Sequence, residues 1–329
     1  MERFEGLKVL VVGDVMIDAY SKGVVERMSP EAPVPIVNLK ERFNRLGGAA
    51  NVALNLRALG AEPLVCSIIG DDESGRMLIQ LMQEQGLQVS GLVSSNHRRT
   101  TVKHRILDGD KQLLRIDEED TFDLNGVERS ILNFVIGKAF DQQAIDVVVL
   151  QDYNKGVLTE ALIHDIIALC HEKHIPVAVD PKKKNFFAYQ GATLFKPNAK
   201  ELREGLGVKA ETLEDLQQAM LHLQERLNCE YLMVTLSDKG VMILNEGIFH
   251  HLPAHPRDIK DVSGAGDTVL SVAALCVACR DASDASTLAS PETIAALSNI
   301  AGGLVCEESG VVPINGERFT EEVKRICHE

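Results

Sequence analysis

The sequence lacks any apolar run that approaches the ~18 residues a membrane-spanning helix needs. It also lacks a surplus of positive charge, because 34 lysines and arginines stand against 48 aspartates and glutamates, for a formal net charge of -14. Nucleic acids and anionic membrane surfaces are bound by basic faces, so the sequence predicts neither partner. An anionic substrate must therefore be held by a few local cations or by backbone N–H groups.

A secretion signal is missing from the start of the sequence, where Met1–Lys8 is charged and leads directly into a strand-like run. The seven cysteines are odd in number and scattered, which argues against a disulfide framework and for reduced thiols. We therefore expect a cytoplasmic protein. Cys276 and Cys279 form a CxxC pair inside an apolar helical run, and core packing is favoured over zinc binding because no second pair exists.

Short β-branched runs alternate with helical patterns along most of the chain, which indicates βαβ units and a parallel sheet. No linker or repeat divides the chain, so we expect one domain over residues 1–329, with 45% apolar residues to form its core. The runs that read as buried strands are 7–12, 63–69, 146–150, 176–179, 193–195 and 231–235. Helical apolar spacing marks 49–59, 73–85, 127–140, 159–171, 213–227, 265–279 and 291–306.

Two segments break this alternation, at about residues 19–43 and 98–117. Both contain strand-like runs, and Asp108-Gly109-Asp110-Lys111 is a hairpin turn signal. Two hairpins inserted into a parallel core predict a small sheet that stands off the main domain as a lid over a site at the strand ends. An exposed apolar face on such a sheet favours pairing with a second copy, hence a homodimer.

The sharpest chemical signal is Asp261-Val-Ser-Gly-Ala-Gly-Asp267, which leads into an apolar helix. Gly264 and Gly266 allow a tight turn, so that their N–H groups and that of Ala265 converge at the positive end of the helix dipole. A carboxylate there would repel a bound phosphate, but it suits a general base that takes a proton while the amides hold a transferring phosphoryl group. On the two glycines alone, a capped helix start is the alternative.

Two other nucleotide-binding motifs are absent. No GxxxxGK[ST] occurs, which disfavours a P-loop enzyme. The first strand, Val9–Asp14, does not continue into GxGxxG, so a nucleotide-dependent oxidoreductase lacks its glycines.

A second cluster, Gly47, Gly48 and Asn51, allows close backbone approach to a ligand and offers an amide that suits a sugar hydroxyl. Asp14 and Asp18 follow the first strand and are candidates for further hydroxyl contacts. In isolation the glycines equally suit an ordinary loop-to-helix turn, and the aspartates equally suit helix caps.

Polar residues also follow later strands. Asn198 and Glu201 share one helix face and suit a water-mediated Mg²⁺ shell, although a capping box explains them equally well. The segment Thr235–Gly240 is either a nucleotide-phosphate contact or a polar turn. The cations of 103–105, of Lys155 and of 182–184 are surface charges unless the fold gathers them. His250, His251 and His255 lack a completing metal-ligand pattern, so we interpret them as exposed residues at a strand end.

Together, and in this order, Gly47–Asn51, Asn198–Glu201 and Asp261–Asp267 resemble the motifs of the ribokinase-like (PfkB) family of sugar kinases. Three further segments, Arg27–Pro35, Asp152–Gly156 and Val179–Lys182, resemble the heptose 7-phosphate kinases within that family, which also occur as the kinase half of bifunctional kinase/adenylyltransferases. No nucleotidyltransferase HxGH segment follows, so we expect the stand-alone kinase version.

The resemblance implies a three-layer α/β/α core with a mostly parallel sheet and a small protruding β-sheet lid. It implies transfer of the γ-phosphate of ATP to O1 of D-glycero-D-manno-heptose 7-phosphate, giving the 1,7-bisphosphate used for lipopolysaccharide core heptose. Mg²⁺ would accompany ATP, and K⁺ is a candidate near Asp261 and residues 307–310.

The resemblance also assigns roles to residues. Asp267 would be the base, with the anion hole at Gly264, Ala265 and Gly266. The sugar would contact Asp14, Asp18, Gly47, Gly48, Asn51 and Asp152. The nucleotide would be bordered by Lys196, Asn198, Glu201, Thr235, Ser237, Gly240, Val262, Gly264, Gly266 and Asn299, with Glu201 reaching Mg²⁺ through water. For the substrate phosphate, Lys103 and Arg105 are the first candidates, and Lys155 and Lys182 the next.

Two alternatives stay open. The acceptor is another sugar or sugar phosphate, such as fructose, ribose or tagatose 6-phosphate, or the chain is a catalytically silent sugar sensor on the same fold. The intact carboxylate of Asp267 argues against the silent sensor.

Overall fold

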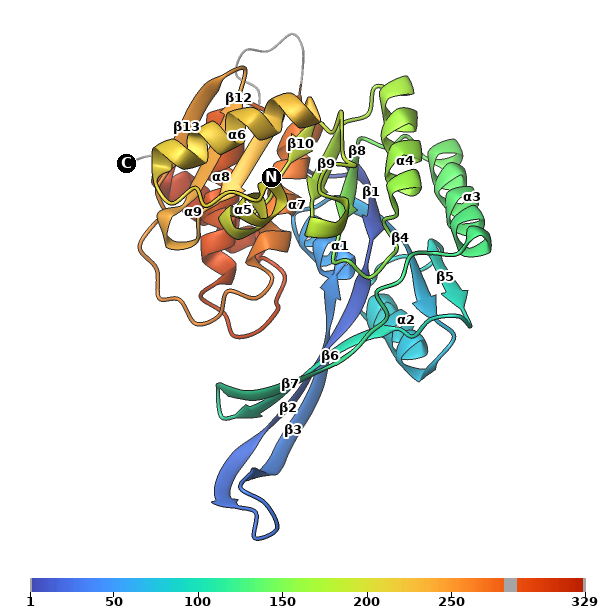
Figure 1. Ribbon diagram of the computed structural model, residues 1–329, viewed down its shortest axis with the longest axis vertical. Coiled ribbons are helices and arrows are strands. Elements are labelled where there is room, and N and C mark those ends of the chain that lie inside the picture. Colours follow the sequence, from blue (N-terminus) through green and yellow to red (C-terminus); the bar gives the residue numbers. More distant parts are fainter. Residues whose placement is uncertain (1, 281–288, 328–329) are drawn as a thin grey trace.

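The main sheet of the computed structural model is long, twisted and mostly parallel (Figure 1). The structure describes residues 2–280 and 289–327. In the part described, the antiparallel pairs of this sheet are β11 with β12 and β12 with β13. In spatial order the strands are β13 (Ile248–Leu252), β12 (Val241–Asn245), β11 (Tyr231–Thr235), β10 (Leu194–Phe195), β9 (Val177–Asp180), β8 (Val147–Gln151), β1 (Lys8–Gly13), β4 (Glu62–Gly70) and β5 (Leu92–Ser95).

The central strands are almost wholly apolar and buried. Every residue of β8 is buried, and so is every residue of β1 except Lys8. Continuous Val and Leu runs of this kind form strands that are covered on both faces, as parallel sheets require. Their carboxyl ends lie together because β1, β8 and β9 pair in parallel register, Gly13 beside Gln151 and Gln151 beside Asp180.

Helices cover both faces of the sheet, and each face has its own apolar core. One face carries α1 (Ala49–Ala58), α2 (Glu73–Glu84), α7 (Ala265–Ala278), α8 (Pro291–Val305) and α9 (Gly316–Cys327). The other carries α3 (Gly126–Gln142), α4 (Glu160–Glu172), α5 (Ala199–Leu206) and α6 (Leu213–Leu227). The three-layer α/β/α core is therefore confirmed.

A four-stranded small sheet projects from this core (Figure 1). Its order is β3 (Pro35–Gly48), β2 (Val15–Met28), β6 (Thr101–Asp108) and β7 (Lys111–Glu118). Each hairpin is antiparallel, and the two are joined by the parallel pair β2 and β6. The first hairpin is longer than the segment 19–43 that the sequence indicated, because Val15 and Met16 pair with Gly48 and Gly47.

The CxxC cysteines and the histidines at 250 and 251 lie in different parts of the fold. Cys276 is buried in α7, and no disulfide joins the cysteines at positions 66, 170, 229, 276, 279 and 306. His250 and His251 lie on β13 at the sheet edge. Among the described residues, no cluster of three potential metal ligands occurs.

No helix in the described ranges combines the length and the apolar character needed to span a bilayer.

Candidate active site

The candidate site lies at the carboxyl ends of the parallel strands, where β1, β8, β9 and β10 end in polar residues. Asp14 follows β1, Gln151 ends β8, Asp180 ends β9 and Lys196 follows β10; all four are buried. Ligands of open α/β sheets bind at this edge, because the loops that follow the strands converge there.

Two helices begin at this edge without a side-chain cap. The helices α1 and α7 start after Gly48 and Gly264, at φ 60° and 84° respectively. The helices α2 to α6 and α8 instead carry Asp, Asn, Thr or Ser caps. Because the first N–H groups of a helix have no intrahelical acceptor, bare starts leave N–H groups and the positive dipole end for a ligand. Residues 264–266, where the sequence predicts an anion hole, lie at one of these starts, and the Ala265 N–H there donates to the Val262 carbonyl at 3.3 Å.

The carboxylate of Asp267 is 3% exposed and holds the two helix starts together. Its Oδ2 accepts from Asn51 Nδ2 at 2.7 Å. Its Oδ1 accepts from the Tyr153 hydroxyl at 2.8 Å and from Gln151 Nε2 at 3.3 Å. Burial raises the pKa of Asp267 to about 6, with Asp180 adding to the rise and the hydrogen bonds opposing it. A carboxylate with this pKa is ionised at neutral pH and can still take a proton, as a general base must.

Gly48 is required by the backbone at the start of α1. A Cβ there would lie 2.3 Å from the carbonyl oxygen of Asp14, and the φ of 60° is in the left-handed region. We expect Gly48→Ala to lower the free energy of unfolding by about 2 kcal/mol or more, since backbone cannot rotate away as a side chain does. Denaturant unfolding measures this change. The control Gly137→Ala, in α3 with no atom within 4 Å of its Cβ, should be neutral or stabilising; equal losses would contradict the steric explanation.

The carboxylates predicted for the sugar side mostly hold the protein together in this structure. Asp14 accepts from three backbone N–H groups of the 153–157 loop, at 2.8 to 3.2 Å. Asp152 accepts from the Tyr189 hydroxyl at 2.8 Å. Asp18 forms an ion pair with Arg105, and a Cβ on Gly47 would lie 2.3 Å from its Oδ2. The glycine at position 47 thus leaves room for the Asp18 carboxylate.

Next to Asp267 lies a row of alternating charges. Lys196 Nζ is 3.2 Å from Asp180 Oδ2, and both groups are buried. Lys182 pairs with Glu201, whose other oxygen accepts from the Asn198 N–H at 2.8 Å in a capping box. The capping-box geometry and the predicted nucleotide role therefore involve the same two residues of α5.

The remaining nucleotide candidates form the rim beyond β11. The backbones of Thr235 and Asn198 pair in an isolated parallel β-bridge. Gly240 (φ 89°) packs against residues 252–254, and Asn299 Nδ2 donates to the Pro253 carbonyl at 2.8 Å. Ser237 begins a 3₁₀ turn and Val262 is 66% exposed. Gly240 and Asn299 are distant in sequence, but both contact the segment 252–254.

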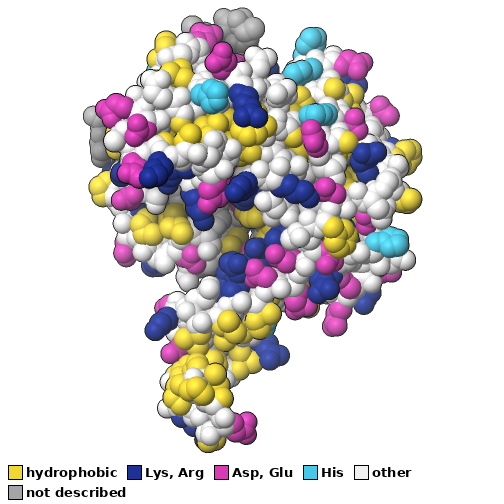
Figure 2. All heavy atoms as spheres, viewed as in Figure 1, with side chains coloured by type: hydrophobic (Ala, Val, Ile, Leu, Met, Phe, Trp, Pro, Cys, Tyr) yellow, Lys and Arg dark blue, Asp and Glu magenta, His cyan; other side chains and the backbone are white. Residues whose placement is uncertain are grey.

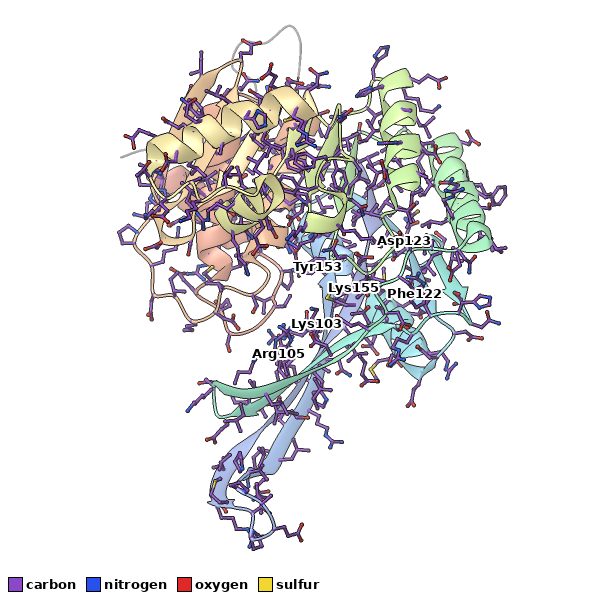
Figure 3. The ribbon with its side chains drawn as sticks, in the orientation of Figure 1. Lys103, Arg105, Phe122, Asp123, Tyr153 and Lys155 are labelled. Carbon is purple, nitrogen blue, oxygen red and sulfur yellow. The ribbon has the colours of Figure 1, made fainter. Side chains whose placement is uncertain are left out.

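The small sheet presents cations toward the site (Figure 3). Arg105 is paired with Asp18, and Lys155 Nζ with Glu119 at 2.6 Å. Lys103 is partly buried, and no described carboxylate lies within 4.0 Å of its ammonium. Burial and the Lys155 charge both lower the pKa of Lys103. A partly buried ammonium without a partner is the most favourable of these cations for an incoming anion.

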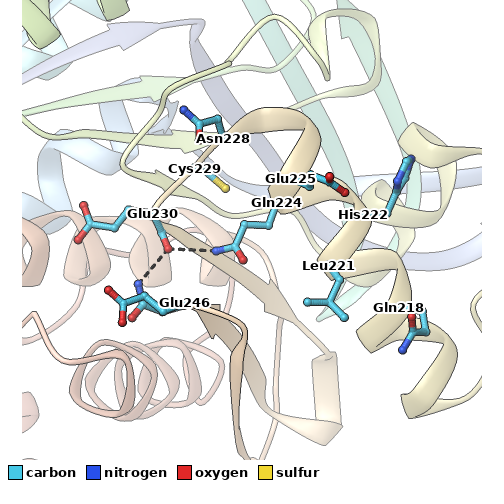
Figure 4. A pocket seen from close by; sticks show the side chains of 10 residues that line it. Gln218, Leu221, His222, Gln224, Glu225, Asn228, Cys229, Glu230 and Glu246 are labelled. Carbon is cyan, nitrogen blue, oxygen red and sulfur yellow. Dashed lines mark hydrogen bonds between the residues drawn. The ribbon is translucent and has the colours of Figure 1, made fainter.

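A surface depression of about 650 Å³ lies elsewhere, between α6 and the strands β11 and β12 (Figure 4). It is lined by residues such as His222, Cys229 and Glu246, and Gln224 Nε2 donates to the Glu230 carbonyl there at 3.1 Å. These residues lie at the amino end of β11, opposite the edge that holds Asp267. The depression is therefore separate from the candidate site.

Three residues of the site were not singled out from the sequence: Gln151, Tyr153 and Asp180. Gln151 is the one polar residue of an otherwise apolar strand, which was the available signal. Tyr153 and Asp180 stand inside segments that carried the family resemblance, but only the pairing of β8 with β9 places them beside Asp267.

Comparisons with known proteins agree with this geometry. Residues 7–315 match the model of the pfkB family carbohydrate kinases. The bifunctional protein HldE of Citrifermentans bemidjiense is 39% identical over 324 residues, covering 98% of this chain and 64% of that protein. HldE of Methylobacillus flagellatus is 40% identical over 316 residues, covering 96% and 63%. The chain thus spans less than two thirds of the length of these curated relatives.

Solved structures share the fold at low sequence identity. Phosphofructokinase-2 from Escherichia coli in complex with potassium superposes with a TM-score of 0.80 at 17% identity, covering 98% of this chain and 99% of that one. Arabidopsis thaliana ribokinase complexed with ribose and ATP gives a TM-score of 0.73 at 17% identity, covering 97% and 99%. On the family match the chain belongs to the pfkB family of carbohydrate kinases, and the solved structures share its fold.

Proposed function

We propose that the chain phosphorylates D-glycero-D-manno-heptose 7-phosphate at O1, which would supply the 1,7-bisphosphate for lipopolysaccharide core heptose. The segments Arg27–Pro35, Asp152–Gly156 and Val179–Lys182 support this acceptor through their resemblance to heptose 7-phosphate kinases. The HldE relatives, at 36 to 40% identity, support the same subgroup.

One observation favours an acceptor that already carries a phosphate. The protein is acidic overall, yet Lys103 places an unpaired, partly buried ammonium between the small sheet and the core, near Lys155 (Figure 3). Figure 2 shows further basic side chains where the small sheet joins the body. Lys155 already pairs with Glu119, so Lys103 is the ammonium left for an incoming anion, and a phosphate dianion would stabilise its charged form.

In this account Asp267 takes the proton from the O1 hydroxyl as O1 attacks the γ-phosphorus of ATP. The bond from γ-phosphorus to the β,γ-bridging oxygen breaks, and ADP leaves with that electron pair. The N–H groups of Gly264, Ala265 and Gly266 stabilise the charge on the transferring phosphoryl group, aided by the α7 dipole. Lys196 and the rim at residues 235–240 would hold the nucleotide.

The donor set fits a hydrated Mg²⁺ that arrives with ATP. Asp180 Oδ1 and Gln151 Oε1 are buried oxygens without a hydrogen-bond partner among the described residues. Hard oxygen donors of this kind suit Mg²⁺, which keeps several of its waters. Glu201 and Asp180 would hold the ion through water, and the ion would neutralise charge on the β- and γ-phosphates. For K⁺, the candidate Asp261 accepts one hydrogen bond on each carboxylate oxygen, from the Ser263 and Gly310 N–H groups, and each oxygen keeps one acceptor site.

An acceptor panel tests the substrate. The protein is incubated with Mg-ATP and, in turn, heptose 7-phosphate, fructose, ribose and tagatose 6-phosphate, and ADP release is measured. We expect heptose 7-phosphate to give the highest kcat/KM by a wide margin. Preference for another acceptor would refute the proposed substrate while leaving the kinase assignment intact, and ADP release with none of them would favour a silent sensor.

We also propose a homodimer formed through the small sheets. Leu114 and Ile116 on β7 are 56% and 45% exposed, and Val24, Val34 and Leu39 add to the apolar surface of this sheet (Figure 2). We expect the double variant Leu114→Glu, Ile116→Glu to be monomeric by light scattering, since charge disrupts an apolar interface. The control Val127→Glu, on α3 and 70% exposed, should stay dimeric. A monomeric parent protein, or a double variant that is still dimeric, would contradict the proposal.

A further inference from the structure

The hydroxyl of Tyr153 contacts the carboxylate that the proposed mechanism uses as a base. It donates to Asp267 Oδ1 at 2.8 Å, and Tyr153 is half-buried. Tyr153 comes from the loop after β8, whereas Asp267 lies in the first turn of α7. The contact therefore joins the central sheet to the helix that carries the anion hole.

The acceptor sites of the Asp267 carboxylate are unequally used. Each carboxylate oxygen can accept about two hydrogen bonds. Oδ1 accepts from both Tyr153 and Gln151, so its sites are filled. Among the described residues, Oδ2 accepts from Asn51 alone, which leaves one site for the proton of an acceptor hydroxyl. The two donors on Oδ1 thus fix the rotation of the carboxylate and decide which oxygen is available.

Tyr153 is itself held firmly. Its backbone N–H donates to Asp14 Oδ2 at 2.8 Å, and Lys182 Nζ lies 5.3 Å from the centre of its ring. Further along the same loop, Gly156 (φ 86°) has no room for a side chain, since a Cβ would lie 1.9 Å from the Phe122 carbonyl oxygen. A rigid loop and a cation over the ring leave the hydroxyl little freedom to turn away from Asp267.

We propose that Tyr153 is a positioning residue of the phosphoryl transfer, holding Asp267 with its free Oδ2 site toward the attacking hydroxyl. The inference rests on the proposed function, because it needs Asp267 to act as the base. Lys182 also pairs with Glu201 on the nucleotide side, so Tyr153 connects the base to the elements expected to bind Mg-ATP.

The charged groups around Asp267 set its ionisation together with Tyr153. Asp180 from β9 opposes ionisation, while Lys196 after β10 and Lys182 after β9 favour it. The charge of Asp18, on β2, helps to raise the pKa of the Tyr153 phenol. The hydrogen bond from Tyr153 stabilises the ionised carboxylate, so its removal must raise the pKa of Asp267.

The test is the pH profile of kcat/KM for Tyr153→Phe, which keeps the ring over Lys182 and removes only the hydroxyl. The parent protein should lose activity as pH falls through about 6, the pKa of Asp267. In the variant this acid limb should move to higher pH, so that kcat/KM falls about tenfold more near pH 5.5 than near pH 8.

Tyr189→Phe is the matched control, because the Tyr189 hydroxyl donates at 2.8 Å to another buried carboxylate, Asp152, whose pKa is also raised to about 6. It should leave the position of the acid limb unchanged. An unmoved limb in Tyr153→Phe, or equal movement in both variants, would overturn the inference. Circular dichroism and the Tm of each variant identify any loss of fold. If Tyr153→Phe loses its fold, Tyr153→Leu is measured in the same way, and its acid limb must move to higher pH. A parent protein without turnover would instead refute the proposed function.

Discussion

Asp267→Asn should lower kcat by about a thousandfold while leaving the affinity for ATP nearly unchanged. General-base catalysis contributes about 10²- to 10⁴-fold, and the proposed base Asp267 is buried, accepts from Asn51 and Tyr153, and lies in the first turn of α7. The amide keeps the volume of the side chain and loses the proton acceptor. Steady-state kinetics give kcat, and calorimetry gives the affinity for ATP.

Asp152→Asn provides the comparison for this variant. Asp152 is also buried at the strand ends, with a pKa raised to about 6, but its oxygens accept from Tyr189 and from the Asn154 N–H. We expect a loss much smaller than that of Asp267→Asn. If Asp267→Asn retained kcat within about tenfold of the parent protein, the assignment of the base would be wrong.

Lys103→Met should raise KM for the phosphorylated sugar by about a hundredfold, with a small change in KM for ATP. A hydrogen bond to a charged group is worth about 1.5 to 3 kcal/mol, and Lys103 lacks a carboxylate partner among the described residues. Arg105→Ala should raise the same KM less, because Arg105 already neutralises Asp18. Initial-rate kinetics with each substrate varied in turn check both effects.

The prediction depends on KM rising for the phosphorylated sugar and not for ATP. Equal increases in KM for the sugar phosphate and for ATP would show a general disturbance of the site. A larger effect from Arg105→Ala than from Lys103→Met would show that the Asp18 ion pair opens on substrate binding.

The parallel core was predictable because its signals are local. Continuous Val and Leu runs such as those of β1 and β8 form buried strands in almost any parallel arrangement, and the helical periods of α4, α6 and α8 agree with the structure within one residue at each end. The edge hairpin of β12 and β13 was not predicted, although Glu246 and Gly247, both at positive φ, form a tight turn. The strand β12 is apolar and buried like the central strands, whereas the edge strand β13 mixes polar and apolar residues and is partly exposed.

The two glycines at the end of β3 were interpreted from the sequence as part of a turn, not as part of a strand. Gly47 and Gly48 read as a ligand-binding turn, but both pair with β2 as the last residues of β3. Glycine within a strand often marks a place where another group approaches the backbone closely. Gly47 is both a strand residue and a residue that leaves room for the Asp18 carboxylate.

The chemistry of the site was predictable only in part. The sequence of residues 261–267 contains both the glycine turn and the carboxylate, so the proposed base and anion hole are suggested by one local segment. The donors that orient Asp267 lie 114 to 216 residues away along the chain, at Tyr153, Gln151 and Asn51. Their roles depend on strand order and register, which a single sequence does not specify.

The most direct test of the account is analysis of the product formed from Mg-ATP and D-glycero-D-manno-heptose 7-phosphate. The account predicts a sugar heavier by one phosphoryl group, with a new phosphorus resonance coupled to the anomeric proton. Unchanged heptose 7-phosphate, or a new phosphate on any oxygen other than O1, would contradict it.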